Sequence, residues 1–252
     1  MKIYRFAHNG TVSYGVADGT SIRRLKEEQP FGSLATTGRA FPMDDVEILC
    51  PVSPGKIVGV GRNYLAHAHE LGNEVPREPL LFLKPPSSVI GPGDEVFLPS
   101  ISKQVDYEGE LAIVVGTNCR DIDQDDWRDY VLGFTCANDV TARDLQKKDG
   151  QFTRAKGFDT FCPLGPCIET ELDPSDLGIR TRRNGEVVQE GRTSLMIVPV
   201  GGLLAFISTI MTLDPGDVIL TGTPAGVGPL SDGDEVEVEI EGIGTLLSPV
   251  VG

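Results

Sequence analysis

The sequence has 252 residues, of which 40% are hydrophobic and 23% are charged, and this length is enough to bury a full core. Its formal net charge of −15 argues against nucleic acid as a partner, because binding phosphates requires a basic surface. No apolar segment is long enough to cross a bilayer, and the first residues have no signal-peptide pattern, so we expect a soluble cytoplasmic protein without a membrane partner.

The chain has five cysteines, an odd number, and none of them forms a CxxC pair. Cys162 and Cys167 flank the sequence PLGP, which is a poor spacing for a zinc site and for a disulfide framework. We therefore predict free, buried thiols.

The first residues are rich in strand and turn signals, and we predict a small β-rich domain over residues 1–53. Two short strands are expected to meet at Asn9-Gly10, which is a strong hairpin turn signal. The stretch TSIRRLKEE, residues 20–28, is expected to form a short helix. Pro51 and Pro54 mark the boundary to a larger domain over residues 54–252.

The larger domain shows many strands and few helices. Helices are expected at Leu65–Leu71, closed by Gly72, and at Val200–Thr212. Strand and helix patterns do not alternate as a doubly wound sheet requires, so the predicted class is mixed α+β and β-dominated, a sandwich, roll or barrel. The predicted strands are Lys56–Val60, Leu80–Leu83, Glu95–Leu98, Glu108–Val115, Tyr130–Asn138, Pro166–Thr170, Ile179–Arg183, Val218–Thr221, Glu235–Ile240 and Gly244–Val250.

The stretch DYEGELAIVVG, residues 106–116, places two acidic residues at the start of a buried strand. Because side chains alternate along a strand, Glu108 and Glu110 share one face with Ala112 and Val114. Two carboxylates in a dry place require either a proton or a cation between them, and oxygen ligands suit Mg²⁺, Mn²⁺ or Ca²⁺. The alternative is that the pair lies at an exposed strand end. Gly109, between them, suggests close backbone packing behind the site.

A third carboxylate, that of Asp139, follows the predicted strand GFTCAN. Three carboxylates from two strand ends would make a sound Mg²⁺ site. The alternative for Asp139 is to cap the N-terminus of a helix that contains VTARDLQ.

Two of the three histidines lie in the stretch RNYLAHAHELGNE. On a helix, His67 and Glu70 are three residues apart and face the same way, so the carboxylate can orient the ring and raise its basicity. His69 then lies off that face. As a strand, HAH would suggest a hydrolase metal site, but such sites need further histidines downstream and there are none. An ordinary polar surface helix is the remaining alternative.

Three weaker signals accompany these. GVGRNY lacks the third glycine of a dinucleotide turn, so we reject that interpretation. The loop LTGTPAGVG, residues 220–228, can turn N–H groups and a hydroxyl toward a carboxylate, or it is an ordinary connection. Lys156 could hold an anionic substrate near a metal, or it is simply solvated.

Taken together, the sequence resembles the fumarylacetoacetate hydrolase family. The resemblance covers about residues 54 to 252, and the motifs occur in the order of the family. They are VGRNYLAHAHE, PLLFLKPPSSVIGPGD, YEGELAIVVG, NDVTARDLQ, RAKGFDTFCPLGP, NGEVVQEG and GDVILTGTPAGVGPL. This resemblance implies that the catalytic domain is a β-sandwich roll and that the protein is a homodimer.

The resemblance also implies roles for single residues. The carboxylates of Glu108, Glu110 and Asp139 match positions that bind one Mg²⁺ or Mn²⁺ per subunit. His67 and Glu70 match a dyad that activates water. The positions that match the substrate site are Arg143, Gln146, Lys156 and Thr223, and Lys156 is also expected to take part in catalysis. Larger hydrolases have a further carboxylate before the base; none stands near Asn63-Tyr64, so that ligand is expected to be water.

The implied substrate is a small anionic 2-oxo acid. The favoured reaction is hydrolysis of a C–C bond in an acylpyruvate such as fumarylpyruvate or acetylpyruvate, with pyruvate leaving as its metal-chelated enolate. Decarboxylation of oxaloacetate and isomerisation or decarboxylation of 2-hydroxy-dienedioates in aromatic-acid breakdown are alternatives. An alternative of another class is a non-catalytic binding protein that a metal stabilises.

Overall fold

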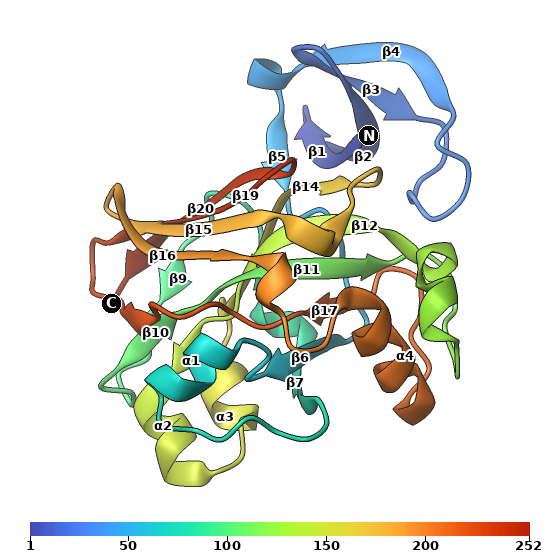
Figure 1. Cartoon of the computed structure of the whole chain (residues 1–252). Coiled ribbons are helices and arrows are strands. Elements are labelled where there is room, and N and C mark those ends of the chain that lie inside the picture. The colour runs from blue at the N-terminus through green and yellow to red at the C-terminus, as the bar shows by residue number, and fades with distance from the viewer.

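β-Strands dominate the computed structural model, which describes residues 1–252, and the predicted mixed, β-rich class is confirmed (Figure 1). Four α-helices interrupt the strands: α1 (Leu65–Glu70), α2 (Arg143–Asp149), α3 (Thr153–Lys156) and α4 (Val200–Ile210). Short 3-10 helices are η1 (Met43–Asp45), η2 (Pro86–Ser88), η3 (Gln124–Tyr130), η4 (Pro174–Asp176) and η5 (Thr193–Leu195). None of the helices has the length and apolar character that spanning a membrane requires.

The largest sheet has 12 strands and runs through the whole molecule. Its strands in spatial order are β4 (Thr36–Pro42), β3 (Ser21–Leu25), β2 (Thr11–Asp18), β1 (Lys2–His8), β14 (Cys162–Glu169), β12 (Val131–Asn138), β11 (Gly109–Val115), β17 (Val218–Leu220), β6 (Ile57–Gly61) and β7 (Leu80–Lys84). In addition, β5 (Glu47–Leu49) pairs with β1, and β8 (Val89–Ile90) pairs with β14.

Two smaller sheets pack around the large one. The five-stranded sheet has the order β16 (Glu186–Arg192), β15 (Gly178–Arg183), β19 (Glu235–Ile240), β20 (Gly244–Val251) and β9 (Val96–Phe97). The three-stranded sheet has the order β13 (Thr141–Ala142), β10 (Val105–Tyr107) and β18 (Gly228–Pro229).

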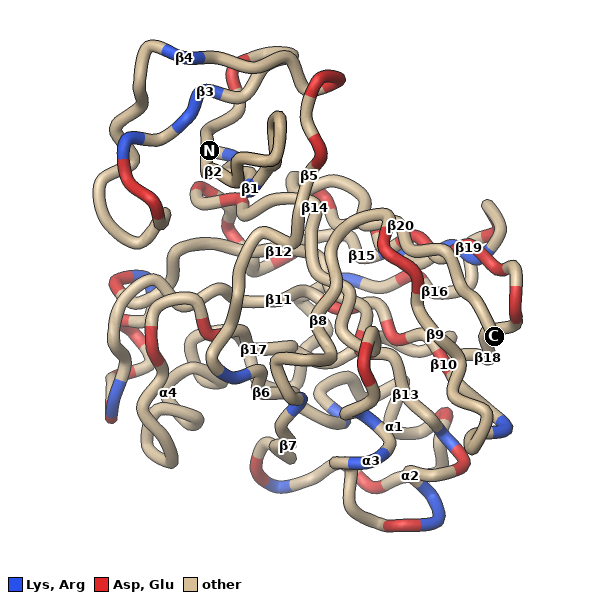
Figure 2. Tube along the Cα trace, turned by 180° about the vertical axis from the view of Figure 1, so that it is seen from behind, with Lys and Arg blue, Asp and Glu red and all other residues tan.

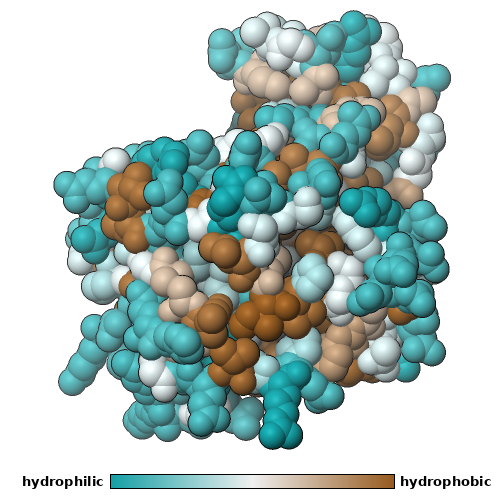
Figure 3. Space-filling model, viewed as in Figure 1, coloured by the Kyte–Doolittle hydropathy of each residue, from teal (hydrophilic) through white to brown (hydrophobic).

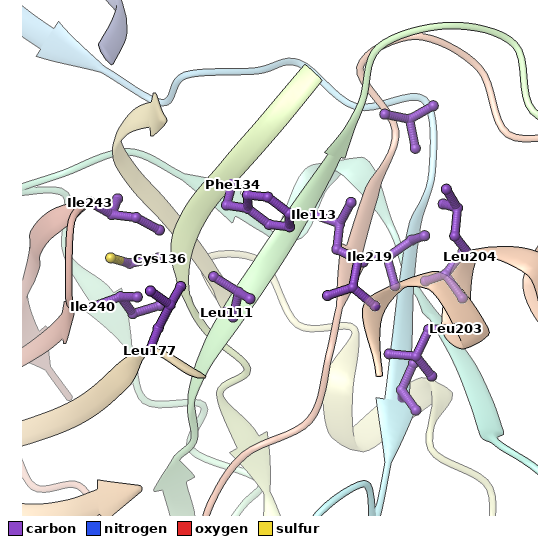
Figure 4. Close-up of a cluster of buried hydrophobic side chains, with 14 of the residues drawn as sticks. Leu111, Ile113, Phe134, Cys136, Leu177, Leu203, Leu204, Ile219, Ile240 and Ile243 are labelled. Atoms are coloured by element: carbon purple, nitrogen blue, oxygen red, sulfur yellow. The ribbon is translucent and has the colours of Figure 1, made fainter. Parts of the chain in front are cut away.

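Strand β11 lies at the centre of the core and is covered on both faces, as its sequence predicts. Leu111 and Ile113 point into a cluster of 22 buried residues that also includes side chains of β12, β17 and α4 (Figure 4). Ala112 and Val114 point into a second cluster on the opposite face. All seven residues of β11 are buried, so this strand is a rigid support for whatever lies at its ends.

The N-terminal strands continue the large sheet, since β1 pairs with β14 at Lys2 and Ile3. The Asn9-Gly10 hairpin is confirmed, and both residues have positive φ. The helix predicted at residues 20–28 is wrong. Residues Ser21–Leu25 form β3, which pairs with both β2 and β4. A domain boundary after residue 53 stays a prediction.

Apolar side chains gather on the face that carries α1, in the lower half of the view in Figure 3. Exposed large apolar residues of α1 and of residues 195–197 include Leu65, Leu195 and Ile197. The two segments are neighbours, because Tyr64 and Met196 form an isolated β-bridge. The five cysteines are free, and four of them are buried, as the sequence predicts.

Candidate metal centre and active site

The pairing of β11 with β12 brings three carboxylates together. Gly109 lies opposite Asn138, and beyond that pair the N–H of Asp139 donates to the carbonyl of Glu108 at 2.8 Å. Glu108 therefore lies beside Asp139, while Glu110 points to the same face one step further along the strand. Ligand atoms of Glu108, Glu110 and Asp139 lie within 4.8 Å of one another, and all three residues are buried. Asp139 does not cap α2, because the N-cap residue of that helix is Ala142.

Gly109 lies directly behind this cluster, and the expected close packing is confirmed. A Cβ atom at this position would lie 2.2 Å from Oγ1 of Thr181 and 3.3 Å from Cγ1 of Val238. The backbone of Gly109 is held on both sides: its N–H donates to Gln189 at 3.0 Å, and its carbonyl accepts from the Thr223 hydroxyl at 2.9 Å. The backbone between the two glutamates is therefore fixed.

Three cationic side chains balance the carboxylates. Lys156 donates to Glu108 at 2.8 Å and to Asp139 at 2.5 Å. The ammonium group of Lys84, whose side chain is 0% exposed, donates to the other oxygen of Asp139 at 2.6 Å. Arg143 bridges Glu108 and Asp106. Figure 2 shows basic segments close to α1 and α3, the elements that surround this cluster.

The charges in this network shift the acidities of its carboxyls in opposite directions. Burial by itself would raise the pKa of Glu108, but Lys156 and Arg143 outweigh it and hold that pKa far below the ordinary range. Burial, reinforced by the negative charges of Asp139 and Glu108, holds the pKa of Glu110 well above its ordinary range. Burial opposes the charge of Lys156, yet Asp139 and Glu108 raise its pKa.

The cluster fits a hard divalent cation. Its donors are carboxylate oxygens, as Mg²⁺ and Mn²⁺ prefer. Glu110 receives one hydrogen bond, from the N–H of Gly222 at 2.7 Å, and no ion pair, so its charge lacks a partner that a cation can supply. Glu108, Glu110 and Asp139 are therefore the residues that would hold the metal.

His67 is buried and lies on α1, and the helix predicted at this place is confirmed. Its Nδ1 lies 3.5 Å from Oε2 of Glu70 and has no hydrogen-bond partner. The other oxygen of Glu70 accepts from the N–H of Gly226 at 2.9 Å, so the glycine-rich loop holds this carboxylate in place. With Nδ1 directed at Glu70, Nε2 is the ring nitrogen that remains free for proton transfer.

One cavity of about 210 Å³ connects these groups. The residues predicted for catalysis, metal binding and substrate binding line this cavity, with the exception of Glu70. The predicted lining residues are His67, Glu108, Glu110, Asp139, Arg143, Gln146, Lys156 and Thr223. Gln146 accepts from Arg143 at 2.7 Å, and Thr223 accepts from Gln189 at 2.9 Å, so both are already oriented by neighbours.

Sequence reasoning missed three buried polar residues around the cavity. Lys84 supports Asp139, Asp106 orients Arg143, and Gln189 fixes both Gly109 and Thr223. Each stands in a motif already noticed. The position of Lys84 at the end of the apolar strand LLFL could have indicated a buried, paired lysine. The Asn184-Gly185 turn could have indicated the hairpin that carries Gln189.

Comparison with known proteins is consistent with this arrangement. The family model described as "Fumarylacetoacetate (FAA) hydrolase C-terminal" matches residues 56–251, and the one described as "Rv2993c-like, N-terminal" matches residues 1–51. The chain is 50% identical to Protein Rv2993c of Mycobacterium tuberculosis, over 100% of this chain and 98% of that protein.

Two further relatives have names that describe an activity. The chain is 43% identical to the human mitochondrial oxaloacetate tautomerase FAHD2A, over 96% of this chain and 84% of that protein. The solved structure of 5-carboxymethyl-2-hydroxymuconate delta-isomerase from Mycobacterium smegmatis has a TM-score of 0.93 and 48% identity, and covers 100% of this chain and 99% of that one. The chain therefore belongs to the fumarylacetoacetate hydrolase family.

Proposed function

We propose that this protein is a divalent-metal-dependent enzyme that moves a proton at carbon 3 of a small 2-oxo acid, with keto–enol tautomerisation of oxaloacetate as its reaction. One observation carries the proposal. A buried imidazole, His67, lines the same small cavity as three buried carboxylates that fit one divalent cation. A base beside a cation site is the minimum that such a proton transfer needs.

The side chains of the chain divide the work. Arg143 and Gln146 would bind the substrate's 1-carboxylate, since they line the cavity next to the carboxylate cluster. Bound Mg²⁺ or Mn²⁺ would act as a Lewis acid that makes the hydrogen on carbon 3 more acidic. Nε2 of His67 takes that proton, while Lys156 donates a hydrogen bond to the 2-oxo oxygen as it gains negative charge. The imidazolium then gives its proton to this oxygen, so one proton has moved and no atom is lost.

Names among the relatives support this choice. The human relative is a tautomerase, and the structure from Mycobacterium smegmatis is that of an isomerase. Both names denote rearrangement within one molecule. The volume of about 210 Å³ also favours a small substrate over an extended one.

The test follows the ultraviolet absorbance of enol-oxaloacetate as it converts to the keto form, with Mg²⁺, and with the same buffer and Mg²⁺ without protein as the blank. We expect the wild-type protein to accelerate the conversion and His67→Gln to lose about 10²–10⁴-fold of that acceleration. The exposed His69 offers the matched control, because His69→Gln removes an imidazole from the same helix and should retain activity. Equal rates for wild type and His67→Gln would contradict the proposal.

C–C hydrolysis of an acylpyruvate is the second candidate, and the His67–Glu70 pair is the observation that favours it, because it can deprotonate a water molecule. Acetylpyruvate, fumarylpyruvate and maleylpyruvate, each with Mg²⁺, test this reaction by release of pyruvate. Pyruvate release from oxaloacetate measures decarboxylation, which needs no water and should therefore survive His67→Ala. If no substrate reacts and chelator changes only the melting temperature, the protein is a binding protein.

A further inference from the structure

Four cationic side chains line the cavity, but only two of them are compensated. Arg143 and Lys156 form buried ion pairs with the carboxylate cluster. Arg62 and Lys147 also line the cavity, yet neither forms an ion pair or a side-chain hydrogen bond. In a chain with a net charge of −15, cations without partners around one cavity are unusual and require a reason.

Helix α2 orders these groups by depth. Arg143, Gln146 and Lys147 all line the cavity, and their spacing of three and four residues puts them on one face of the helix. Gly150, the C-cap of this helix, lines the cavity as well. Arg143 is buried, Gln146 is half-buried and Lys147 is exposed, so the helix leads from the carboxylate cluster to the cavity mouth. Arg143 and Lys147 are four residues apart, which corresponds to a rise of about 6 Å along the helix. This rise is close to the length of a four-carbon diacid.

Arg62 carries a second sign of function, because its backbone is strained. Its φ of +59° lies in the left-handed region. Asn9, Asp121 and Asn184 share this conformation and are residue types that tolerate it. Arg62 and Thr160 are not such types, and of these two only Arg62 lines the cavity. Strain of this kind persists where surrounding structure enforces it, and it concentrates at functional sites.

Four of the cavity's lining residues are hydrophobic. Phe82 and Phe152 pack edge to face with ring centroids 5.6 Å apart, and both line the cavity with Val60 and Leu71. The face of Phe82 already lies 5.0 Å from the ammonium of Lys156, and the rest of this apolar lining suits the carbon chain between two polar ends. The cavity thus has an inner end for a 2-oxo acid, an apolar middle and a cationic mouth.

We propose that Arg62 and Lys147 form a subsite for a second carboxylate, at the far end of the substrate, so that the enzyme selects 2-oxo diacids over 2-oxo monoacids. The proposal rests on the proposed function, because it assumes that the carboxylate cluster and Arg143 bind the 2-oxo acid end. Arg62 and Lys147 act as specificity residues and take no part in proton transfer.

The test compares oxaloacetate with 2-oxosuccinamate, which has the same shape but a neutral amide in place of the second carboxylate. Exchange of carbon-3 hydrogen for deuterium, followed by NMR with Mg²⁺, gives kcat/KM for each. We expect wild type to prefer oxaloacetate by at least about tenfold, which is near the lower end of what a hydrogen bond to a charged group contributes. The preference should fall in Arg62→Gln and in Lys147→Met and disappear in the double variant, while the rate with 2-oxosuccinamate stays within about twofold of wild type.

Two controls separate charge from fold. Lys148→Met removes the neighbouring exposed lysine, which does not line the cavity, and should keep the full preference. Arg62→Lys keeps the positive charge at the strained position and should keep most of the preference for oxaloacetate. Because the mouth is exposed, added salt should weaken the preference of wild type but not that of the double variant. An equal loss of rate with both substrates, or an unchanged preference in the double variant, would overturn the proposal.

A failure of the proposed function gives a different result. If wild type exchanges neither substrate, calorimetric titration of the Mg²⁺-loaded protein still compares their binding. Tighter binding of oxaloacetate that Arg62→Gln and Lys147→Met abolish would support the subsite and reject the reaction. Equal binding of the diacid and its amide to wild type would reject the subsite itself.

Discussion

Glu110 is the carboxyl in the cluster with the least compensation for its charge. It has one backbone hydrogen bond and no ion pair, and burial and the charges of Asp139 and Glu108 raise its pKa. The folded, metal-free chain therefore holds this proton more tightly than the unfolded chain does. Its contribution to stability is complete below the ordinary pKa of 4.5 and is lost as the pH rises toward the raised value.

Glu110→Gln should consequently stabilise the metal-free protein relative to wild type as the pH rises. One proton changes the free energy of unfolding by at most about 1.4 kcal/mol per pH unit, so the difference should grow from near zero at pH 4. Urea unfolding in chelator at several pH values measures it, with the exposed Glu78→Gln as control. With saturating Mg²⁺, wild type should be more stable than Glu110→Gln, because the variant lacks one of the negative charges that bind the cation. A difference that does not vary with pH would contradict this account.

Gly109 gives a second prediction at the scale of one residue. Gly109→Ala would place a methyl group 2.2 Å from the Thr181 hydroxyl, and overpacking of this kind costs about 1–3 kcal/mol of unfolding free energy. Denaturant unfolding measures the loss. The double variant Gly109→Ala/Thr181→Ala should recover part of it, because the obstructing oxygen is gone. Wild-type stability of Gly109→Ala alone would show that the packing behind the cluster is loose.

The sequence was informative about single site residues wherever a local pattern pointed to them. Strand alternation put Glu108 and Glu110 on one face, and helical spacing put His67 beside Glu70. Lys84 and Asp106 escaped because their partners, Asp139 and Arg143, are 55 and 37 residues away in the sequence. A local sequence pattern cannot predict a contact between residues that are so far apart in the chain.

At the scale of elements, the errors follow from local irregularities. In β3 the buried residues are Ile22 and Leu25, three apart, which imitates a helical period. A register shift between Arg23 and Leu25 in the pairing with β4 produces this spacing in a strand. Strand β14 was expected to start at Pro166 and instead starts at Cys162, because its prolines and glycine read as a loop.

Asn138 links two elements and offers a test of their coupling. Its side-chain oxygen accepts from the N–H of Glu108 at 2.9 Å, at the point where β10 ends and β11 begins. Asn138→Ala should cost about 1–3 kcal/mol by leaving that buried N–H without a partner. It should also weaken Mn²⁺ binding about 10–100-fold, because Glu108 loses its support. Calorimetry measures both effects. Asn118→Ala, which removes an exposed amide, should change neither.

At the scale of the whole molecule, metal binding should stabilise the fold. A cation at one hundred times its dissociation constant adds about 2.7 kcal/mol if it binds the folded chain alone. The melting temperature should therefore rise with Mg²⁺ and return when chelator is added. Glu110→Gln is the informative control, and its melting temperature should respond less to Mg²⁺. Glu108→Ala and Asp139→Ala are less suitable, because each would also leave a buried lysine without an ion-pair partner, at a cost of about 3–5 kcal/mol. An unchanged melting temperature in wild type would argue against the site.

The homodimer stays a prediction, and the chain mass of 27.1 kDa makes it easy to test. Sedimentation equilibrium should give twice this mass. We expect the apolar face with Leu65, Leu195 and Ile197 to be covered in that dimer, so Leu195→Glu should shift the equilibrium toward the monomer. A monomer at all concentrations would leave this face exposed and contradict the expectation.

The buried lysines have a practical consequence for following the fold in solution. Lys84 and Lys156 have side chains that are 0% and 3% exposed, whereas Lys147 and Lys148 are exposed. Amine-reactive labelling of the native protein should mark the second pair and spare the first, and mass spectrometry resolves them. Labels on Lys84 appear only when the sheet opens around β7, so the time course of its labelling reports how often the carboxylate cluster around Asp139 comes apart.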